Sequence, residues 1–440
     1  MRVLVVVTCA LVLALSLVAV GPATPADGAS ISASPVATSG GPPPVTVAQG
    51  ADDAWHNEAV TVTFTATSAI SSVAATYVQI DGGTALPTTA VVIKASRDHT
   101  NDGEHVLTYW SVDAEGRTEA PQTVTVKIDT RPPAVRDLTL SPAVLHRVRP
   151  FRISFSMTDL SGGARLAYEA DDQYGYRARK AAGIEIVPGT TSLRVKDRYG
   201  SDKPWVPGLF RVTLSLVDRA GNSETLAPLL VRDYHPTRAS VTYNVKGAGR
   251  RVALTFDDGG PAAVWARMIA TLKAYHMHAT FFVLGPYVRA ERRVAATAVA
   301  AGDGIGSHAW THTPSTVLGY DGLRRELVES EAPWWSAARV SPVSWFRPPY
   351  GDHDASTVAA AGSVGFAHVV MWDVDPGDWR GYGPGTIAAN TLSHVHSGAI
   401  IGLHVRATTA AALPTILRGL KARGYTSVSL PELFHAAGRH

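Results

Sequence analysis

The feature that most constrains this chain is a pair of adjacent carboxylates, Asp257 and Asp258, placed where an apolar run meets two glycines. Two neighbouring acids repel each other, so a buried pair persists only where one acid binds a cation or keeps a proton. A hydrolytic metal site uses both arrangements, because one acid binds the ion and the other takes a proton from water. An Asp-Asp pair at the end of a strand is by itself more often a turn or a helix cap. The rest of such a site has to lie downstream.

Two downstream histidines, His308 and His312, supply candidate ligands. Their spacing predicts that both imidazoles lie on one face of a helical turn, within reach of one ion. With Asp258 they offer two neutral nitrogens and one carboxylate, a set that suits zinc, and also nickel or cobalt, and leaves coordination positions open. Asp257 is then the candidate general base. Taken alone, a histidine pair with this spacing is a solvated or core pair about as often as a metal site.

Three further segments follow the histidines: residues 346–351, 372–379 and 400–404. Each has a purely structural interpretation when it is taken alone. Arg347 precedes two prolines, which is typical of a rigid extended turn. The aspartates and tryptophans of the second segment can shape a loop or fill a core, and a histidine after an apolar run, here His404, is usually a core residue. Their order behind the Asp pair favours a joint catalytic role.

These five ordered motifs resemble those of the polysaccharide deacetylases with a NodB-homology domain, also called carbohydrate esterase family 4. The resemblance covers roughly residues 249–436, within a catalytic domain that we place at 249–440. It implies a divalent metal, zinc above cobalt or nickel. The implied metal ligands are Asp258, His308 and His312.

The resemblance also assigns roles to the other motif residues. Asp257 would be the catalytic base, Arg347 would orient it, and the backbone amide of Tyr350 would help to bind the oxyanion. His404 would be the general acid, tuned by Asp378. The implied substrate-binding residues are Trp379, Pro349, Tyr350 and Leu403.

The chain departs from the family pattern in its fifth motif. A leucine usually stands two residues before the histidine and lines the acetyl pocket, whereas this chain has Gly402 there and a leucine one position later. An acidic residue often follows the histidine, and here it is Val405. The first motif carries one additional glycine, Gly260. None of these changes removes a proposed ligand, so they bear on substrate preference more than on the reaction.

Apolar strands alternate with helical periodicity through this domain. Strands are predicted over residues 251–256, 279–284, 367–371 and 399–403. Helices are predicted over residues 263–275, 291–301, 321–338 and 410–423. Such alternation predicts an α/β fold with a parallel sheet or barrel and sites at the carboxyl ends of strands. The family resemblance narrows this to an irregular (β/α) barrel.

Upstream, apolar residues alternate with period two, which predicts short strands. Two pieces of sequence, residues 111–117 and 215–222, echo each other. We therefore predict two all-β immunoglobulin-like sandwich domains, at residues 45–131 and 132–236, which resemble bacterial modules of secreted wall and carbohydrate enzymes. A spacer role is favoured over glycan binding. The glycan-binding alternative rests on aromatics expected to be exposed, such as Trp55, Trp110, Tyr174 and Tyr176.

The first residues have the pattern of a secretory signal, with Arg2 ahead of a long apolar run. We predict a signal peptide at residues 1–26 and a Ser/Pro/Gly-rich linker at 27–44, with membrane attachment only if the signal segment stays uncleaved. The one cysteine, Cys9, falls inside that segment. The mature protein would therefore have no disulfide and would be secreted or associated with the cell wall.

Taken together, the sequence predicts a secreted, metal-dependent hydrolase that removes N-acetyl groups from an N-acetylglucosamine-containing polysaccharide such as peptidoglycan, chitin or an exopolysaccharide. Two alternatives are an O-acetyl esterase of xylan and a non-catalytic glycan-binding wall protein. The formal net charge of +3 permits only weak attraction to an anionic wall. The expected partner is the polysaccharide, with no nucleic acid, and the chain is expected to be a monomer.

Overall fold

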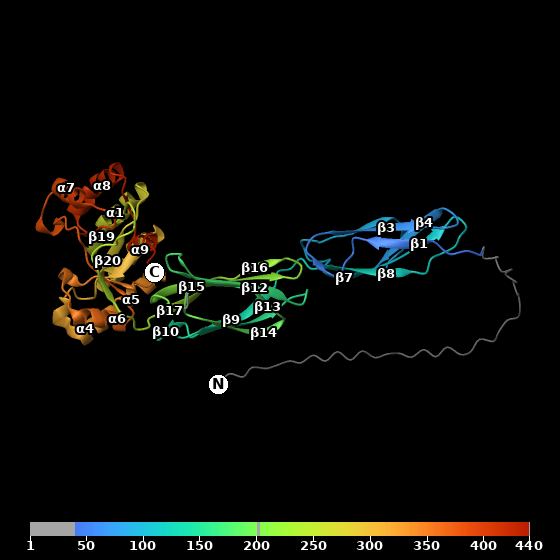
Figure 1. The fold of residues 1–440 in the computed structure, drawn as a ribbon, viewed down its shortest axis with the longest axis horizontal. Coiled ribbons are helices and arrows are strands. Elements are labelled where there is room, and N and C mark those ends of the chain that lie inside the picture. The colour runs from blue at the N-terminus through green and yellow to red at the C-terminus, as the bar shows by residue number, and fades with distance from the viewer. Residues whose placement is uncertain (1–39, 200–202, 440) are drawn as a thin grey trace, which may run out of the picture.

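The computed structural model describes residues 40–199 and 203–439, and they form three regions in a row (Figure 1). Two all-β regions precede an α/β region that holds the carboxyl terminus. The predicted signal segment and most of the predicted linker lie outside the described residues. Within the described ranges, none of the helices combines the length and the apolar character needed to cross a membrane.

The first β region consists of two sheets around a shared apolar core. Alternate residues of its strands are buried, as in β3, where Val62 and Phe64 point inward, and this is the pattern of strands with one face on a core. One sheet has the order β1 (Val45–Gln49), β3 (Val60–Thr67), β6 (Ala90–Ile93). The other has the order β2 (Trp55–His56), β8 (Gln122–Ile128), β7 (Gly103–Asp113), β4 (Val73–Ile80), β5 (Leu86–Pro87).

The second β region repeats this plan around Phe155, Leu166 and Leu214. Its larger sheet has the order β10 (Val144–Leu145), β17 (Leu229–Asp233), β15 (Gly208–Asp218), β12 (Ala164–Asp172), β13 (Arg177–Ile186), with β16 (Ser223–Thr225) on β15. The smaller sheet has the order β14 (Gly189–Val195), β11 (Phe151–Thr158), β9 (Ala134–Ser141). Both regions are all-β, and their relation to immunoglobulin-like modules stays a prediction.

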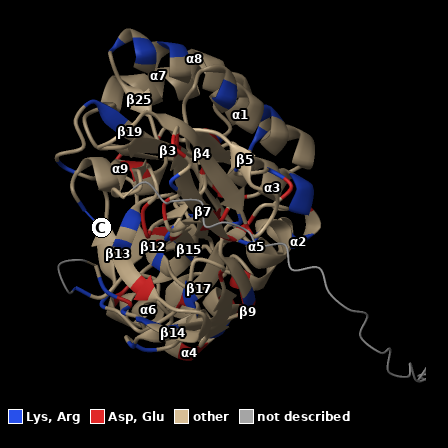
Figure 2. Cartoon of the chain, turned by 90° about the vertical axis from the view of Figure 1, so that its right-hand side faces the viewer, with Lys and Arg blue, Asp and Glu red and all other residues tan. Residues whose placement is uncertain are grey.

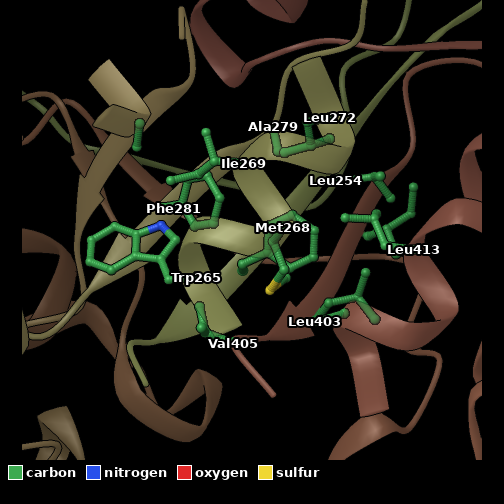
Figure 3. Close-up of a cluster of buried hydrophobic side chains, with 14 of the residues drawn as sticks. Leu254, Trp265, Met268, Ile269, Leu272, Ala279, Phe281, Leu403, Val405 and Leu413 are labelled. Atoms are coloured by element: carbon green, nitrogen blue, oxygen red, sulfur yellow. The ribbon is translucent and has the colours of Figure 1, made fainter. Parts of the chain in front are cut away.

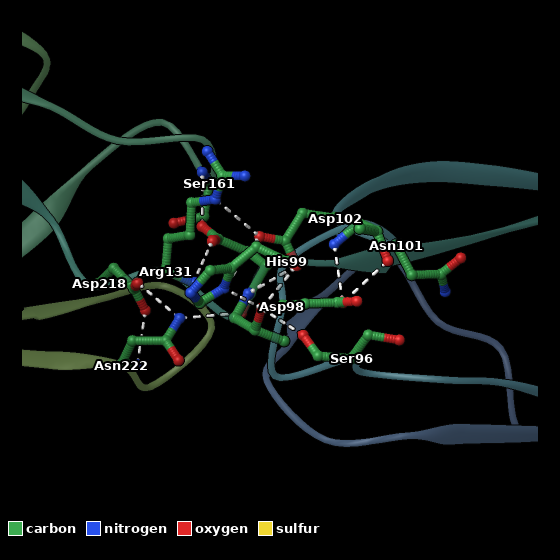
Figure 4. A network of polar contacts seen from close by, with 12 residues as sticks. Ser96, Asp98, His99, Asn101, Asp102, Arg131, Ser161, Asp218 and Asn222 are labelled. Atoms are coloured by element: carbon green, nitrogen blue, oxygen red, sulfur yellow. Dashed lines mark hydrogen bonds and ion pairs between the residues drawn. The ribbon is translucent and has the colours of Figure 1, made fainter.

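The joint between the two β regions is a network of polar contacts (Figure 4). At its centre in the chain is Asp129, which is wholly buried. Its carboxylate accepts hydrogen bonds from the backbone N–H of Arg131 and of Ser161, each at 3.1 Å. Its backbone carbonyl accepts one from the side chain of Asn222 at 2.8 Å. Because Ser161 and Asn222 belong to the second region, these bonds fix the end of β8 onto it.

The α/β region is built on a fully parallel curled sheet. The strand order is β18 (Ser240–Thr242), β23 (His368–Val370), β22 (Trp345–Phe346), β21 (Gly304–Ser307), β20 (Thr280–Val283), β19 (Arg251–Asp258), β24 (Ile400–His404), with β25 (Thr426–Ser427) on β19. The helices are α1 (Ala262–Ala274), α2 (Gly285–Ala290), α3 (Arg292–Ala300), α4 (Ser315–Glu329), α5 (Glu331–Ala338), α6 (Ala355–Ser363), α7 (Pro384–His394), α8 (Ala407–Ala422) and α9 (Leu430–Ala436). The sheet begins with β18, ahead of residue 249, where the sequence placed the start of this domain.

The core of this region lies between the central strands and the helices α1 and α8 (Figure 3). Leu254, Phe281 and Leu403 extend from the sheet toward Trp265 and Met268 of α1. Six consecutive residues of β19 are buried, as expected for a parallel strand covered on both faces. This burial places Asp257 and Asp258 at the carboxyl end of a rigid central strand.

One predicted helix, over residues 321–338, is two helices in the structure. The helix α4 ends at Glu329 and α5 begins at Glu331. Pro333 lacks the N–H that would bond the carbonyl of Glu329 in a continuous helix, so one unbroken helix is disfavoured here. The helices α2, α6, α7 and α9 were not predicted.

The second β region docks directly onto the α/β region. The side-chain amide of Gln173 makes two hydrogen bonds with the backbone of Ser341, at 2.7 and 2.9 Å. The hydroxyl of Tyr174 donates to the carbonyl of Ile305 at 3.4 Å, and the ring of Tyr176 stacks on His435 with centroids 3.9 Å apart. The prediction that Tyr174 and Tyr176 are exposed was therefore wrong, because both side chains are used in this contact.

The other two aromatics proposed for glycan binding, Trp55 and Trp110, are each half-buried in the first β region. Trp110 stacks on Tyr77 of the neighbouring strand, with ring centroids 5.8 Å apart. In the view of Figure 2, Lys and Arg residues are spread over outer helices such as α1 and α8 rather than gathered in one stripe.

Candidate metal and catalytic site

The motif residues converge at the carboxyl ends of the strands, around one cavity of about 410 Å³. The carboxyl ends of parallel strands meet at one edge of the sheet, so side chains from distant motifs share this space. The lining residues are Asp257, Asp258, His308, His312, Tyr350, Trp372, Asp375, Trp379, Gly402, His404 and Arg406.

Three of these residues form a group that fits a metal ion. One oxygen of Asp258, Oδ1, lies 3.4 Å from Nε2 of His308 and 3.1 Å from Nε2 of His312. One ligand atom from each of the three residues lies within 4.8 Å of the others. That oxygen is buried and accepts no hydrogen bond. A buried acceptor without a donor, facing two imidazole nitrogens, is the donor set that a divalent ion such as zinc satisfies.

The two histidines do not lie on a helical turn, which corrects the sequence prediction. They lie in the loop after β21, where Ala309 and His312 have positive φ angles of 66° and 59°. The loop nevertheless brings the two rings together, with centroids 5.3 Å apart. Positive φ angles end any helix, and the side chains converge because the chain turns sharply here.

Each histidine is held through its other ring nitrogen. Nδ1 of His308 hydrogen-bonds the backbone carbonyl of Arg347 at 2.8 Å, and Nδ1 of His312 lies 3.0 Å from the hydroxyl of Tyr350. A carbonyl only accepts, so Nδ1 of His308 carries the proton and Nε2 keeps its lone pair when the ring is neutral. Such support by a second group orients an imidazole for metal binding.

The electrostatics of the group keep the ligands in their metal-binding forms. Burial alone would raise the pKa of Asp258, but its hydrogen bond with His308 and its electrostatic interactions with His308, His404 and His312 lower it to about 2. Burial, together with the neighbouring His308, lowers the pKa of His312. An ionised carboxylate and a neutral imidazole are the protonation states that bind metal.

The second acid of the pair, Asp257, is held by Arg347. Nη1 of Arg347 donates to Oδ1 of Asp257 at 2.8 Å and to the hydroxyl of Thr255 at 2.6 Å. Its other nitrogens donate to the carbonyls of Val370 and Met371, each at 3.0 Å. The guanidinium is fully buried, so these bonds fix the orientation of Asp257.

His404 stands across the cavity on β24 and is held by a buried aspartate. Its Nδ1 lies 2.8 Å from Oδ1 of Asp378, whose other oxygen accepts from the backbone N–H of His404 and from the hydroxyl of Thr409. Burial alone would lower the pKa of His404, but the hydrogen bond to Asp378 and the charges of the nearby aspartates outweigh it and raise that pKa. With Nδ1 bound to Asp378, Nε2 remains available as a proton donor.

Two of the four predicted substrate-binding residues line the cavity and two do not. Tyr350 and Trp379 are 68% and 50% exposed there. Leu403 is fully buried in the core beside α1 and α8, and Pro349 is buried and does not line the cavity. Successive strand residues point to opposite faces, so Gly402 and His404 face the cavity and Leu403 cannot.

The sequence assigned no role to three lining residues, Trp372, Asp375 and Arg406. The oxygens of Asp375 accept from the backbone N–H of Gly377 at 2.8 Å and from the indole N–H of Trp379 at 3.4 Å. Arg406 lies two residues beyond the end of β24, directly before α8, and lines the cavity.

Comparison with known proteins places this site in a family. A family model described as polysaccharide deacetylase matches residues 244–369. The chitooligosaccharide deacetylase of Sinorhizobium fredii is 30% identical over 195 residues, which are 41% of this chain and 90% of that protein. The chain belongs to the polysaccharide deacetylase family.

Two further similar proteins are a longer deacetylase and a deacetylase of known structure. The peptidoglycan-N-acetylglucosamine deacetylase PgdA of Listeria monocytogenes is 30% identical over 233 residues, or 52% of this chain. The match spans about half, 47%, of that protein's length. The structure of the peptidoglycan deacetylase PdaC from Bacillus subtilis superimposes with a TM-score of 0.40 at 29% identity, covering 43% of this chain and 92% of PdaC.

Proposed function

We propose that this protein is a secreted or wall-associated, metal-dependent hydrolase that removes N-acetyl groups from an N-acetylglucosamine-containing polysaccharide and releases acetate. The observation that carries the proposal is the arrangement of three units around one cavity. They are the group of Asp258, His308 and His312, the Arg347–Asp257 pair and the Asp378–His404 pair. The relatives named for peptidoglycan and chitooligosaccharide deacetylation support the substrate class.

Asp258, His308 and His312 would hold a divalent ion, zinc in preference to cobalt or nickel, and that ion would supply Lewis-acid polarisation of the acyl carbonyl and lower the pKa of water. Asp257, held by Arg347, accepts a proton from the attacking water at its carboxylate. The water oxygen bonds to the carbonyl carbon and the carbonyl π electrons move to its oxygen; when they return, the carbon–nitrogen bond breaks. The backbone N–H of Tyr350 donates to the developing oxyanion.

The departing nitrogen needs a proton, and His404 is the group placed to give it. Asp378 holds the imidazole through Nδ1, so Nε2 donates to the sugar nitrogen and leaves a free amine on the glycan. The two exposed aromatics, Tyr350 and Trp379, offer flat apolar faces to the sugar rings. The proposed substrate is therefore a polysaccharide. The proposal takes the protein as a monomer and gives nucleic acid no role as a ligand.

The test is acetate release from the purified protein with zinc, with cobalt or with a chelator. Chitooligosaccharides, peptidoglycan and acetylxylan are offered in parallel. Metal-dependent release from an amino-sugar polymer is the expected result. Release from acetylxylan alone would replace the proposal with an O-acetyl esterase, and silence on all three substrates with metal bound would favour a glycan-binding protein.

A further inference from the structure

Trp372, which has no role in the proton transfers, lines the same cavity as the acids and histidines. It follows β23 and is half-buried, whereas Trp379 in the same cavity is 50% exposed. The cavity therefore has one tryptophan toward solvent and another deeper in. The deeper ring is an apolar surface within the cavity that holds the reacting groups.

Two glycines from different motifs make room for this indole. A Cβ atom added at Gly402 would lie 2.8 Å from Cγ of Trp372, and one added at Gly351 would lie 3.1 Å from its Cη2. Carbon atoms in contact lie about 3.5–4.0 Å apart, so a side chain at either position would displace the ring. Gly351 also has a positive φ of 69°. Gly402 lies in β24 without that requirement, so the indole is the reason for a glycine there.

The ring of Trp372 also lies beside Arg347, the residue that holds the proposed base Asp257. The guanidinium of Arg347 lies 5.4 Å from the centroid of the Trp372 ring and 4.4 Å from that of Phe282. The same guanidinium holds Asp257 at 2.8 Å. An apolar wall next to the base is where the small acyl group of the substrate has to fit while water attacks its carbonyl carbon.

We propose that the indole of Trp372 forms the wall of the pocket that receives the acyl group, and that Gly402 sets acyl-size selectivity by seating the ring there. This inference rests on the proposed function and deepens it. The indole occupies the space that a larger side chain at Gly402 would need. The favoured substrate carries a short N-acyl group, acetyl, and the ring excludes longer ones.

The inference is tested by measuring acyl selectivity. The quantity is kcat/KM for N-propionyl glucosamine oligomers divided by kcat/KM for N-acetyl glucosamine oligomers. Trp372→Leu removes part of the wall and should raise the ratio at least about tenfold, because one methylene in an apolar pocket changes discrimination by about 10–200-fold. Gly402→Ala pushes the ring into the cavity and should lower the ratio. The matched control is Trp379→Leu, which should raise KM for both substrates and leave the ratio unchanged.

An unchanged ratio in Trp372→Leu, with zinc still bound at the parent's stoichiometry, would overturn the inference while leaving the proposed function intact. If that variant does not fold, Gly402→Ala decides, because a ratio that fails to fall there is equally fatal. Failure of the proposed function looks different. The zinc-loaded parent would then release neither acyl group, and the inference would fall with it.

Discussion

Two clusters of carboxylates in this chain differ in what surrounds their charges. At the sheet edge, Asp257 pairs with Arg347 and Asp258 faces two imidazoles. At the joint between the β regions, one carboxylate oxygen from each of Asp129, Asp159 and Asp218 lies within 4.8 Å of the others, the same limit that the ligand atoms of Asp258, His308 and His312 meet. Within the described ranges, none of those three carboxylates forms an ion pair.

The carboxylates of the joint are contacted mainly by neutral donors instead, although one of their oxygens, Oδ2 of Asp159, is buried without a hydrogen bond. Asp129 accepts two backbone N–H groups, and Asp218 accepts those of Gly221 and Asn222. The catalytic cluster opens onto a cavity, whereas the joint is packed between two regions. Both clusters thus bring three potential ligand atoms close together. The groups around those atoms distinguish the reactive site from the structural joint.

The largest effect expected from this comparison is loss of activity when the metal ligands are changed. His308→Ala removes one of three ligands and should weaken zinc binding by more than about 10²-fold. Even a residue that only hydrogen-bonds to a ligand contributes about 10–100-fold to metal affinity. Acetate release should fall to background at equimolar zinc. Calorimetric titration with zinc measures the binding. Asp159→Asn at the joint is the matched control, and a comparable loss of zinc affinity there would break the distinction between the clusters.

Asp257→Asn should reduce kcat by about 10²–10⁴-fold, the usual contribution of a general base. The amide keeps an acceptor for Arg347 but cannot take the proton, and the three metal ligands are untouched. Zinc affinity should therefore stay within a few-fold of the parent's. Retention of most of the activity would show that another group is the base.

The site could be predicted from the sequence only as far as its residue types. The sequence predicted that the Asp pair and the two histidines lie close together, because their residue types, their spacing and their order along the chain can be read directly. Their backbone was not predicted, since the positive φ of Ala309 leaves no signal in composition. Leu403 was assigned to the pocket although strand alternation, applied to His404, already placed it in the core.

Contacts between regions were harder to foresee from the chain. Tyr174 and Tyr176 are typical of exposed sugar-binding aromatics, and only the docking against Ile305 and His435 shows where they go. The seat of Trp372 likewise depends on Gly351 and Gly402, from two separate motifs. The four predicted strands of this sheet were recognised as unbroken apolar runs, because burial along a central strand such as β19 is nearly continuous. The short strands β18, β21, β22 and β25 have no such run and were not predicted.

A smaller effect is expected at the general acid. Because Asp378 supports the raised pKa of His404, Asp378→Asn should lower that pKa and move the alkaline limb of the pH–kcat/KM profile to lower pH. The rate at neutral pH should fall by about 10–100-fold, less than the full contribution of a general acid. Thr409→Val removes one hydrogen bond and keeps the charge, so its profile should shift less. An unmoved alkaline limb in Asp378→Asn would contradict the role of His404.

The smallest effect concerns the thermal stability of the joint. It compares two buried acids, Asp129 and Asp113, whose pKa values are shifted in opposite directions. Burial, with the charges of Asp218 and Asp159, raises the pKa of Asp129. A raised carboxyl pKa stabilises the fold below the unfolded value, near about 3.9, and that stability is lost as pH rises through the folded value. Relative to the parent, the Tm of Asp129→Asn should therefore improve as pH rises from acid to neutral in metal-free buffer.

Another buried acid, Asp113 at the end of β7 in the first β region, should behave in the opposite way. Burial alone would raise the pKa of Asp113, but the hydrogen bonds from Arg117 and from nearby backbone N–H groups lower it. A lowered carboxyl pKa contributes stability above the unfolded value, so Asp113→Asn should become more costly as pH rises. Thermal melts of both variants across that range measure the two slopes. Equal slopes would remove the contrast between the two acids, and a Tm of Asp129→Asn that falls relative to the parent as pH rises would contradict the raised pKa of Asp129.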